Sequence, residues 1–288
     1  MLADLAFVTP DASGEVRFVL DGGWSGTDQR RVRVELADWR PDAATLSLDR
    51  EGFVLDRVVS GITDYRDEDQ VAEQWIPAAR EAILRRTGGA WAVTFAGPLV
   101  RFSEADARSQ GSAVSAPARA VHSDLAASFR FDQFAAQPHA EAAVAELVRR
   151  LSGREPARWR VFNLWQAISP PPQDVALAFC TLGSLGQDDY VAGLGHFAEP
   201  GIPAGEILAR RDGRPTFDMT FLRANPAQRW GIFADMLPGE AVIFSTFDPA
   251  CGPGFRRVPH GAVTVAEPGR PAVPRSSIEI RALVVFED

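Results

Sequence analysis

Three side chains of this sequence have the chemistry and spacing of a metal site. His122 and Asp124 form an H-x-D pair, and His260 lies much later, directly before a predicted strand. If the first segment is extended, His122 and Asp124 point to one face with their Cα atoms about 6–7 Å apart. Two histidines and one carboxylate form the facial triad that binds iron(II) and leaves positions open for a cosubstrate and O2.

The remaining histidines offer one alternative ligand. The chain has four histidines in all. His196 lies in the glycine-rich segment 193–197, which we predict to be a flexible loop over the site, so His196 could replace His260 as a ligand. His139 precedes a predicted helix and is predicted to be a surface or capping residue. The triad named above is the preferred prediction.

A predicted strand after His260 carries side chains suited to a carboxylate. Arg275 and Ser277 alternate onto one face, and a planar guanidinium binds a carboxylate through two parallel hydrogen bonds. We therefore predict that Arg275 anchors the distal carboxylate of 2-oxoglutarate and that Ser277 adds a hydrogen bond. Arg281 is an alternative anchor. An exposed edge strand in which Glu279 pairs with Arg281 is the other explanation of this pattern.

A second predicted strand supplies two further candidates. Asn163 and Trp165 alternate onto one face of it. Asn163 is predicted to hydrogen-bond 2-oxoglutarate or the substrate. Trp165 is predicted to line the substrate pocket, with ordinary core packing as the alternative.

The elements that must position these residues are mostly short strands. Two amphipathic helices are also expected, at about 68–86, where Pro77 predicts a kink or a late start, and at about 140–151. We therefore predict a mainly β fold with flanking helices around a double-stranded β-helix, the jelly-roll core of cupins and related oxygenases. Alternating or Val-, Phe- and Trp-rich runs predict strands at 31–39, 53–59, 90–102, 159–165, 175–181, 216–222, 230–233, 241–247, 261–265 and 277–286.

The chain is long enough for one large domain, which we predict to span residues 1–288. Residues 1–110 would supply strands and a helix packed on the core, and residues 111–288 would form the jelly-roll core. The Gly-, Ser- and Ala-rich stretch 108–118 is predicted to be a mobile loop that leads into the H-x-D pair.

Composition excludes several classes of function. The net charge of −8 argues against a nucleic-acid partner, because an acidic surface repels phosphates. Two cysteines without a CxxC pair exclude a thiolate zinc site and indicate reduced thiols in the cytoplasm. The sequence shows no apolar run of ~18 residues and no secretory signal, so no membrane partner is expected.

Short motifs in the later part of the chain resemble one known family. The resemblance is to the hydroxylase/desaturase family typified by AsaB-like and CmcJ-like proteins, and it covers roughly residues 119–286. Residues 1–110 resemble that family only loosely. The motifs that carry the resemblance are Val121-His-Ser-Asp124, Val161-Phe-Asn-Leu-Trp165, Arg229-Trp230, Asp235-Met236, Pro238-Gly-Glu240, Phe247-Asp248, Pro259-His260 and Pro274-Arg-Ser-Ser-Ile-Glu-Ile-Arg281.

The resemblance implies an iron(II)/2-oxoglutarate-dependent oxygenase of secondary metabolism that hydroxylates or desaturates a small molecule. It implies the same ligand triad, with Arg275 as the cosubstrate anchor and Ser277 as its helper. The sequence departs from the family pattern at Gln166, where arginine is usual, and at 231–232 and 261–263. These positions are predicted to touch the pocket, so Gln166 is a predicted pocket residue and the substrate would differ from those of fungal members.

Two other functions fit the same residues. A cupin-type metalloenzyme that does not use 2-oxoglutarate would share the triad without needing Arg275, and a non-catalytic jelly-roll binding protein would need neither. Succinate formation that depends on Arg275 would distinguish them. The sequence leaves open the substrate, the choice between hydroxylation and desaturation, and the oligomeric state, for which a homodimer is one option.

Overall fold

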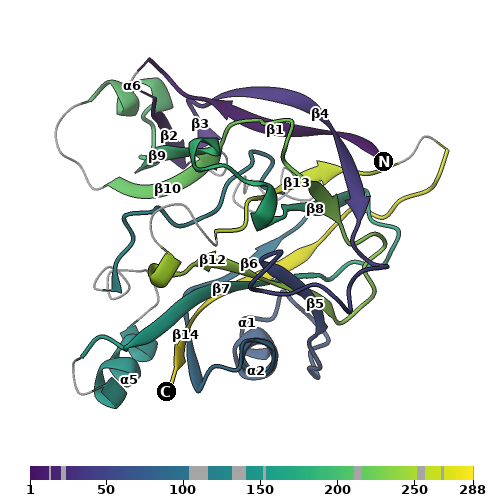
Figure 1. The fold of residues 1–288 in the computed structure, drawn as a ribbon, viewed down its shortest axis with the longest axis vertical. Helices are drawn as coiled ribbons and strands as arrows, with labels where there is room; N and C mark the ends of the chain where they lie inside the picture. The colour runs from purple at the N-terminus through teal and green to yellow at the C-terminus, as the bar shows by residue number, and fades with distance from the viewer. Residues whose placement is uncertain are drawn as a thin grey trace.

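Two facing β-sheets form the body of the protein (Figure 1). The computed structural model describes residues 1–12, 14–20, 24–103, 116–131, 141–151, 154–210, 216–251, 257–266 and 269–287. Within these residues, the first sheet consists of β5 (Phe53–Arg57), β12 (Glu240–Phe247), β7 (Arg158–Ala167), β14 (Ser277–Phe286) and β6 (Trp91–Arg101), in that order. The facing sheet consists of β1 (Leu2–Thr9), β4 (Asp28–Asp38), β11 (Trp230–Ile232), β8 (Val175–Cys180) and β13 (His260–Thr264).

A smaller sheet extends this body at one end. Its order is β10 (Thr216–Leu222), β9 (Tyr190–Phe197), β2 (Val16–Leu20) and β3 (Trp24–Ser25). Strand β9 pairs antiparallel with β10 and parallel with β2. This sheet lies beside the segment that carries His122, because His122 forms an isolated bridge with Phe221 of β10.

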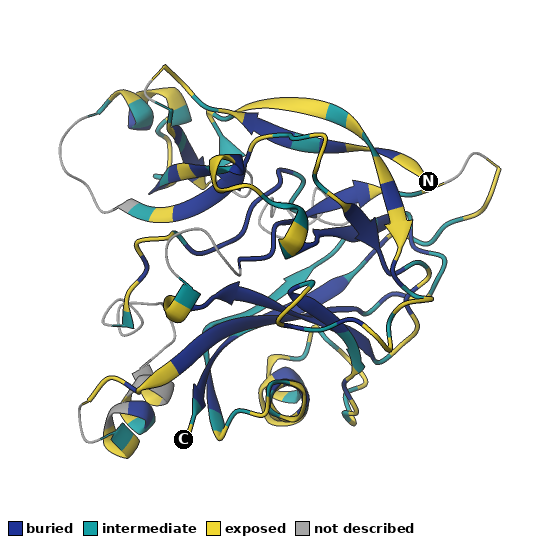
Figure 2. Ribbon diagram, viewed as in Figure 1, coloured by how far each residue is buried: buried dark blue, intermediate teal, exposed yellow. Residues whose placement is uncertain are grey.

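Both faces of the first sheet are covered, which explains its composition. Every residue of β7 after Arg158 is buried. Continuous hydrophobic runs are typical of strands buried on both faces. Figure 2 shows β7, β12 and β14 as mostly buried and α2 as a mixture of buried and exposed residues. One face of β7 therefore points between the sheets and the other points toward the helices.

The predicted helix at 68–86 is confirmed, with a break in its first half. It consists of α1 (Glu68–Gln70), a π-helical turn (Val71–Trp75) and α2 (Ile76–Thr87). Pro77 is the second residue of α2 and directly follows the π-helical turn, and the N–H that proline lacks removes one hydrogen bond from the continuous helix at this break. Asp67 caps the first turn, and Gly88 ends the helix with a φ of 69°. Helix α2 packs on the outer face of the first sheet (Figure 1).

The other helical elements are short. Helix α5 (Glu141–Leu151) confirms the second predicted helix and buries Leu147 against the same cluster as Trp159. Helix α6 (Ala204–Ala209) packs beside β2. Single 3₁₀ turns occur at Leu182–Ser184, Gln187–Asp189 and Pro249–Cys251. No helix among the described residues is both long and apolar enough to span a membrane.

The predicted strands are all present, but β1, β2, β3 and β9 were not predicted. The prediction of a flexible loop at 193–197 is wrong, because these residues belong to β9. Their glycines allow close packing rather than flexibility: a Cβ at Gly193 would lie 2.7 Å from the Phe221 ring, and one at Gly195 would lie 2.4 Å from Phe217. Most of the predicted mobile loop at 108–118 lies outside the described residues.

Candidate metal centre

The fold brings His122, Asp124 and His260 together. Their potential ligand atoms all lie within 4.8 Å of one another, and all three residues are buried. Asp124 places one carboxylate oxygen 3.8 Å from Nε2 of His122 and the other 3.7 Å from Nε2 of His260. The donor set of two imidazoles and one carboxylate suits iron(II). The residues therefore fit the metal that the sequence predicts.

The backbone fixes the two histidines as a pair. His122 N–H donates to the carbonyl of His260 at 3.0 Å, and His260 N–H donates to the carbonyl of His122 at 2.8 Å. His260 is the first residue of β13 and is held in register by β8. Residues 138 positions apart in sequence therefore become direct neighbours without any contribution from their side chains.

Each imidazole has one nitrogen bound to the backbone and one facing Asp124. Nδ1 of His122 lies 2.9 Å from the carbonyl of Ala120, and Nδ1 of His260 lies 3.1 Å from that of Val258. A neutral imidazole that donates from Nδ1 keeps its Nε2 lone pair for a metal. Burial, and then the neighbouring His260, lower the pKa of His122 to about 3, so His122 is neutral near pH 7.

Asp124 is ionised and stands on a strained backbone. Burial alone would raise the pKa of this carboxyl, but the Arg281 guanidinium and the two imidazoles hold it well below its ordinary range. Its φ is 49°, in the left-handed region that Asp and Asn tolerate better than most residues. Such strain is concentrated at functional sites, where surrounding contacts hold it in place.

Asn163 and Arg281 both contact Asp124, which changes the roles expected of them. Nδ2 of Asn163 donates to Asp124 Oδ2 at 2.7 Å and to Glu279 Oε1 at 2.6 Å. Nη2 of Arg281 donates to Asp124 Oδ1 at 2.6 Å. The structure therefore places Arg281 against Asp124, one of the three candidate ligands. Asn163 is likewise engaged by two carboxylates.

Arg275 and Ser277 are buried and have polar side-chain atoms without a hydrogen-bond partner among the described residues. Arg275 is 2% exposed, and its Nε and Nη1 have no hydrogen-bond partner among the described residues; the same is true of the Ser277 hydroxyl. Burial, and then the charges of Arg101 and Arg119, lower the pKa of Arg275 to about 9. Buried polar groups are normally hydrogen-bonded, and an unpaired buried cation is costly. This pair is therefore suited to receive a carboxylate.

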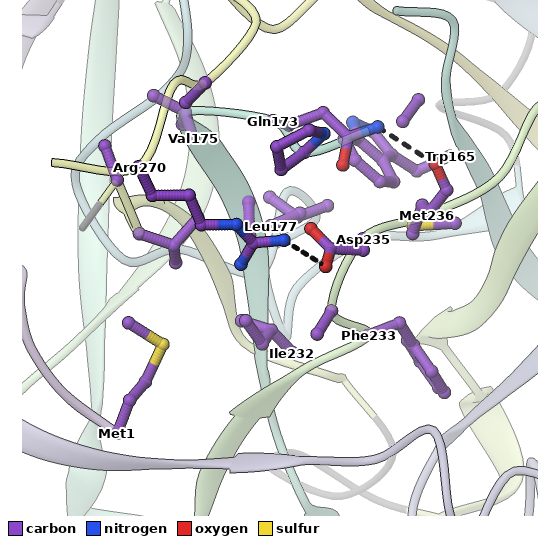
Figure 3. Close-up of a pocket in the computed structure, with 17 residues that line it drawn as sticks. Met1, Trp165, Gln173, Val175, Leu177, Ile232, Phe233, Asp235, Met236 and Arg270 are labelled. Atoms are coloured by element: carbon purple, nitrogen blue, oxygen red, sulfur yellow. Dashed lines mark hydrogen bonds and ion pairs between the residues drawn. The ribbon is translucent and has the colours of Figure 1, made fainter. Parts of the chain in front are cut away.

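Trp165 connects the anchor to a cavity between the sheets. The Cζ atom of Arg275 lies 5.5 Å from the centre of the Trp165 ring. Trp165 also lines a cavity of about 120 Å³. Figure 3 shows Trp165 beside this cavity with Leu177, Ile232 and Phe233. Trp165 therefore lines a cavity, and its role in binding a substrate stays a prediction.

The prediction that Gln166 lines the pocket is wrong. Strand alternation turns its side chain to the opposite face of β7 from Asn163 and Trp165. There its Oε1 accepts a hydrogen bond from Nε1 of Trp75 at 2.8 Å, and its Nε2 lies 3.2 Å from the Tyr65 hydroxyl. Gln166 thus ties the π-helical turn to the sheet and does not line the pocket.

His196 does not join the centre. His196 lies in β9, with its Nε2 3.3 Å from Nη2 of Arg17, and the group of close ligand atoms among the described residues does not include it. The prediction for His139 lies outside the described residues. The sequence missed Trp24, whose ring packs edge-on against His122 at 4.6 Å. No motif surrounds Trp24, so no sequence signal pointed to it.

A family model matches nearly the whole chain. The family described as Oxidoreductase/YMDC permease-like domain matches residues 5–285. The chain belongs to this family.

Curated relatives of this family member are fungal. The chain is 32% identical over 132 residues to the hydroxylase/desaturase asaB of Aspergillus flavus, covering 46% of this chain and 57% of that protein. It is 26% identical to the alpha-ketoglutarate-dependent dioxygenase phiK of a fungal species, covering 96% of this chain and 90% of that protein. The chain is also 26% identical to the hydroxylase/desaturase efuI of Hormonema carpetanum, covering 94% of this chain and 93% of that protein. These relatives confirm the predicted resemblance and the predicted class of enzyme.

Solved structures confirm the fold of this family member. The iron and alpha-ketoglutarate-dependent endoperoxidase NvfI aligns with a TM-score of 0.72 at 21% identity, covering 100% of this chain and 98% of that chain. A second NvfI structure, in a different conformation, aligns with a TM-score of 0.71 at 23% identity, with the same coverage. The predicted mainly β architecture with a jelly-roll core is therefore confirmed.

Proposed function

We propose that this protein is an iron(II)/2-oxoglutarate-dependent oxygenase that hydroxylates or desaturates a small molecule of secondary metabolism. His122, Asp124 and His260 would hold the iron. One observation carries the proposal: a buried, converging His-Asp-His group shares its interior with a buried arginine whose Nε and Nη1 have no partner among the described residues. Metal and dicarboxylate sites together are what this chemistry requires.

Bound iron(II) would supply the activation of O2, coupled to oxidative decarboxylation of 2-oxoglutarate, that allows attack on an unactivated C–H bond. The chain's own residues do the rest. The two imidazoles and the ionised carboxylate of Asp124 offer three ligand atoms, a set that leaves positions on a bound metal open to a cosubstrate. The buried interior excludes bulk water and strengthens the electrostatic contacts within it.

Arg275 and Ser277 would bind the distal carboxylate of 2-oxoglutarate. A guanidinium can hold both carboxylate oxygens through parallel hydrogen bonds. The unpartnered Nε and Nη1 of Arg275 and the Ser277 hydroxyl supply donors for such a group. The Trp165 ring supports the guanidinium from one side. Arg275 therefore selects a cosubstrate with a second carboxylate.

The proposal also covers the class of substrate, the cellular location and the domain organisation of the protein. A small-molecule substrate suits the buried position of the three candidate ligands, and the net charge of −8 speaks against nucleic acid. A cytoplasmic location is supported by the buried free thiol of Cys180. A single domain spanning residues 1–288 is supported by pairing between early and late strands, such as β6 with β14 and β4 with β11.

Anaerobic titration tests the proposal. Iron(II) followed by 2-oxoglutarate should give the visible charge-transfer band of the chelate, and His122→Ala should abolish iron binding. Turnover should then release succinate in an Arg275-dependent way. Iron binding without succinate would instead support a cupin-type metalloenzyme that does not use 2-oxoglutarate. Failure of the wild-type protein to bind iron would support a non-catalytic binding protein.

A further inference from the structure

We propose that Asn163 and Arg281 are positioning residues that hold one carboxylate oxygen of Asp124 each, and that Glu279 fixes both of them. The proposal rests on the proposed function, because it assigns Asp124 as a metal ligand. It divides the inward side of residues 275–281, which lead into β14 and form its first half, into two parts. Arg275 and Ser277 receive the cosubstrate, whereas Glu279 and Arg281 orient the metal ligand.

Asn163 is held in a single orientation. It is fully buried, and its Oδ1 lies 3.3 Å from the Thr246 hydroxyl, whose single hydrogen is shared with the Val161 carbonyl at 3.2 Å. Its Nδ2 therefore points to the two carboxylates, Asp124 Oδ2 at 2.7 Å and Glu279 Oε1 at 2.6 Å. An amide NH₂ has two hydrogens, so both are used. The amide separates two carboxylates that would otherwise repel each other.

Arg281 meets the other oxygen of Asp124 from the adjacent strand. Arg281 and Asn163 are direct partners in the pairing of β14 with β7. Nη2 of Arg281 lies 2.6 Å from Asp124 Oδ1 and 3.9 Å from Glu279 Oε1. The two donors to Asp124 are therefore set by one register of one sheet. A slip of either strand by one residue would turn the side chain of that strand to the other face.

The consequence for Asp124 is loss of rotational freedom. The torsion that turns a carboxylate about its Cβ–Cγ bond is broad, so the backbone alone does not fix it. Donors on both oxygens fix that torsion and determine which lone pairs face the imidazoles. Outer partners of metal ligands commonly tune affinity in this way. Glu279, which is 8% exposed, completes the arrangement by accepting from Asn163 and pairing with Arg281.

Cobalt(II) binding tests Asn163 without relying on turnover. Asn163→Leu keeps the shape but removes the donors. We expect the dissociation constant for cobalt(II), titrated without oxygen, to rise roughly 10- to 100-fold. The visible absorption of the bound cobalt, which reports ligand geometry, should also change. Wild-type affinity with an unchanged spectrum in Asn163→Leu would overturn the proposal while leaving the metal site intact.

Gln166→Leu is the matched control. Gln166 lies on the same strand, is equally buried, and hydrogen-bonds Trp75 on the opposite face. This variant should lower Tm but leave cobalt affinity and spectrum as in the wild type. An equal loss of cobalt affinity in both variants would show a general structural effect and contradict a positioning role. Absence of cobalt binding in the wild type would overturn the proposed function itself.

Arg281→Met separates positioning from charge. Removing a positive charge beside Asp124 would, by electrostatics alone, strengthen the binding of a cation. Loss of orientation would weaken it. We expect weaker cobalt binding, with the same spectral change as in Asn163→Leu. Tighter binding would show that Arg281 acts only as a competing charge and would overturn its assignment.

Discussion

The start and the end of the segment 275–281, which leads into β14, differ in how their polar side-chain atoms are satisfied. At one end, the Arg275 and Ser277 side chains are buried with donors that have no partner among the described residues. At the other end, Glu279 and Arg281 are bound to Asn163 and Asp124. Unsatisfied buried donors mark a place for a ligand, whereas satisfied groups mark a scaffold. One segment therefore carries both the proposed cosubstrate site and the residues proposed to orient Asp124.

The largest effect should come from Arg275→Met, which removes the unsatisfied cation. Loss of a buried, charge-paired contact costs about 2–4 kcal/mol, or roughly 30- to 1,000-fold in the dissociation constant for 2-oxoglutarate. The free energy of unfolding of the ligand-free protein should rise by about 1–3 kcal/mol, because a desolvated charge disappears. Calorimetric titration and thermal unfolding measure the two changes.

Arg40 provides the control for that experiment. Its guanidinium binds both carboxylate oxygens of Glu240 at 2.9 Å, so it is satisfied. Arg40→Met should lower the free energy of unfolding and leave 2-oxoglutarate affinity unchanged. If Arg275→Met destabilised the protein as Arg40→Met does, the guanidinium of Arg275 would be satisfied in the ligand-free protein and the contrast between Arg275 and Arg281 would be contradicted.

Trp165→Leu should affect both stability and binding. Truncating a buried aromatic costs about 2–4 kcal/mol of unfolding free energy. Loss of the ring beside the guanidinium should also weaken 2-oxoglutarate binding, by about 1 kcal/mol or roughly fivefold. Trp159→Leu, in the separate cluster near α5, should destabilise similarly without changing 2-oxoglutarate affinity. Equal affinity for 2-oxoglutarate in the two variants would disconnect Trp165 from the anchor.

Acid should weaken the metal-free protein through His122. Its pKa is about 3 when folded and 6.5 as the ordinary value. Below pH 6.5 the unfolded chain takes up a proton that the folded chain refuses, so stability falls as the pH falls. The loss is about 1.4 kcal/mol per pH unit, or about 2 kcal/mol by pH 5. Chemical denaturation of wild type and His122→Gln should therefore show different slopes against pH; parallel slopes would contradict a neutral, buried His122.

The smallest effect should come from Ser277→Ala. One neutral donor to a carboxylate contributes about 0.5–1.5 kcal/mol, so 2-oxoglutarate affinity should fall by roughly 2- to 10-fold. Because the hydroxyl has no partner among the described residues, Tm should stay the same or rise slightly. Ser184→Ala is the counterpart, since that hydroxyl donates to the Thr181 carbonyl at 2.8 Å. Its Tm should fall, and a fall in Ser277→Ala as well would mean that Ser277 has a structural partner.

Alternation along the strands was enough to predict the arrangement of β7 and β14, since it placed Asn163 with Trp165 and Ser277 with Arg281 on single faces. It could not show that Asn163 and Arg281 meet at Asp124, because that depends on the register between strands distant in sequence. The prediction for Gln166 was wrong because the family pattern on which it rested carries no information about the strand face that a residue occupies. Strand β9 was missed because its glycines suggest a loop until the rings of Phe217 and Phe221 are known to fill the space above them.

The reciprocal backbone hydrogen bonds between His122 and His260 hold these two residues together independently of the chain that connects them. Their spacing depends on a pair of peptide groups and not on the length or composition of the intervening segments. Loops between residues 124 and 260 can therefore lengthen, shorten or be exchanged while the ligands stay in place. A family built this way can acquire new substrates by changing loops, while the chemistry at the metal is inherited intact.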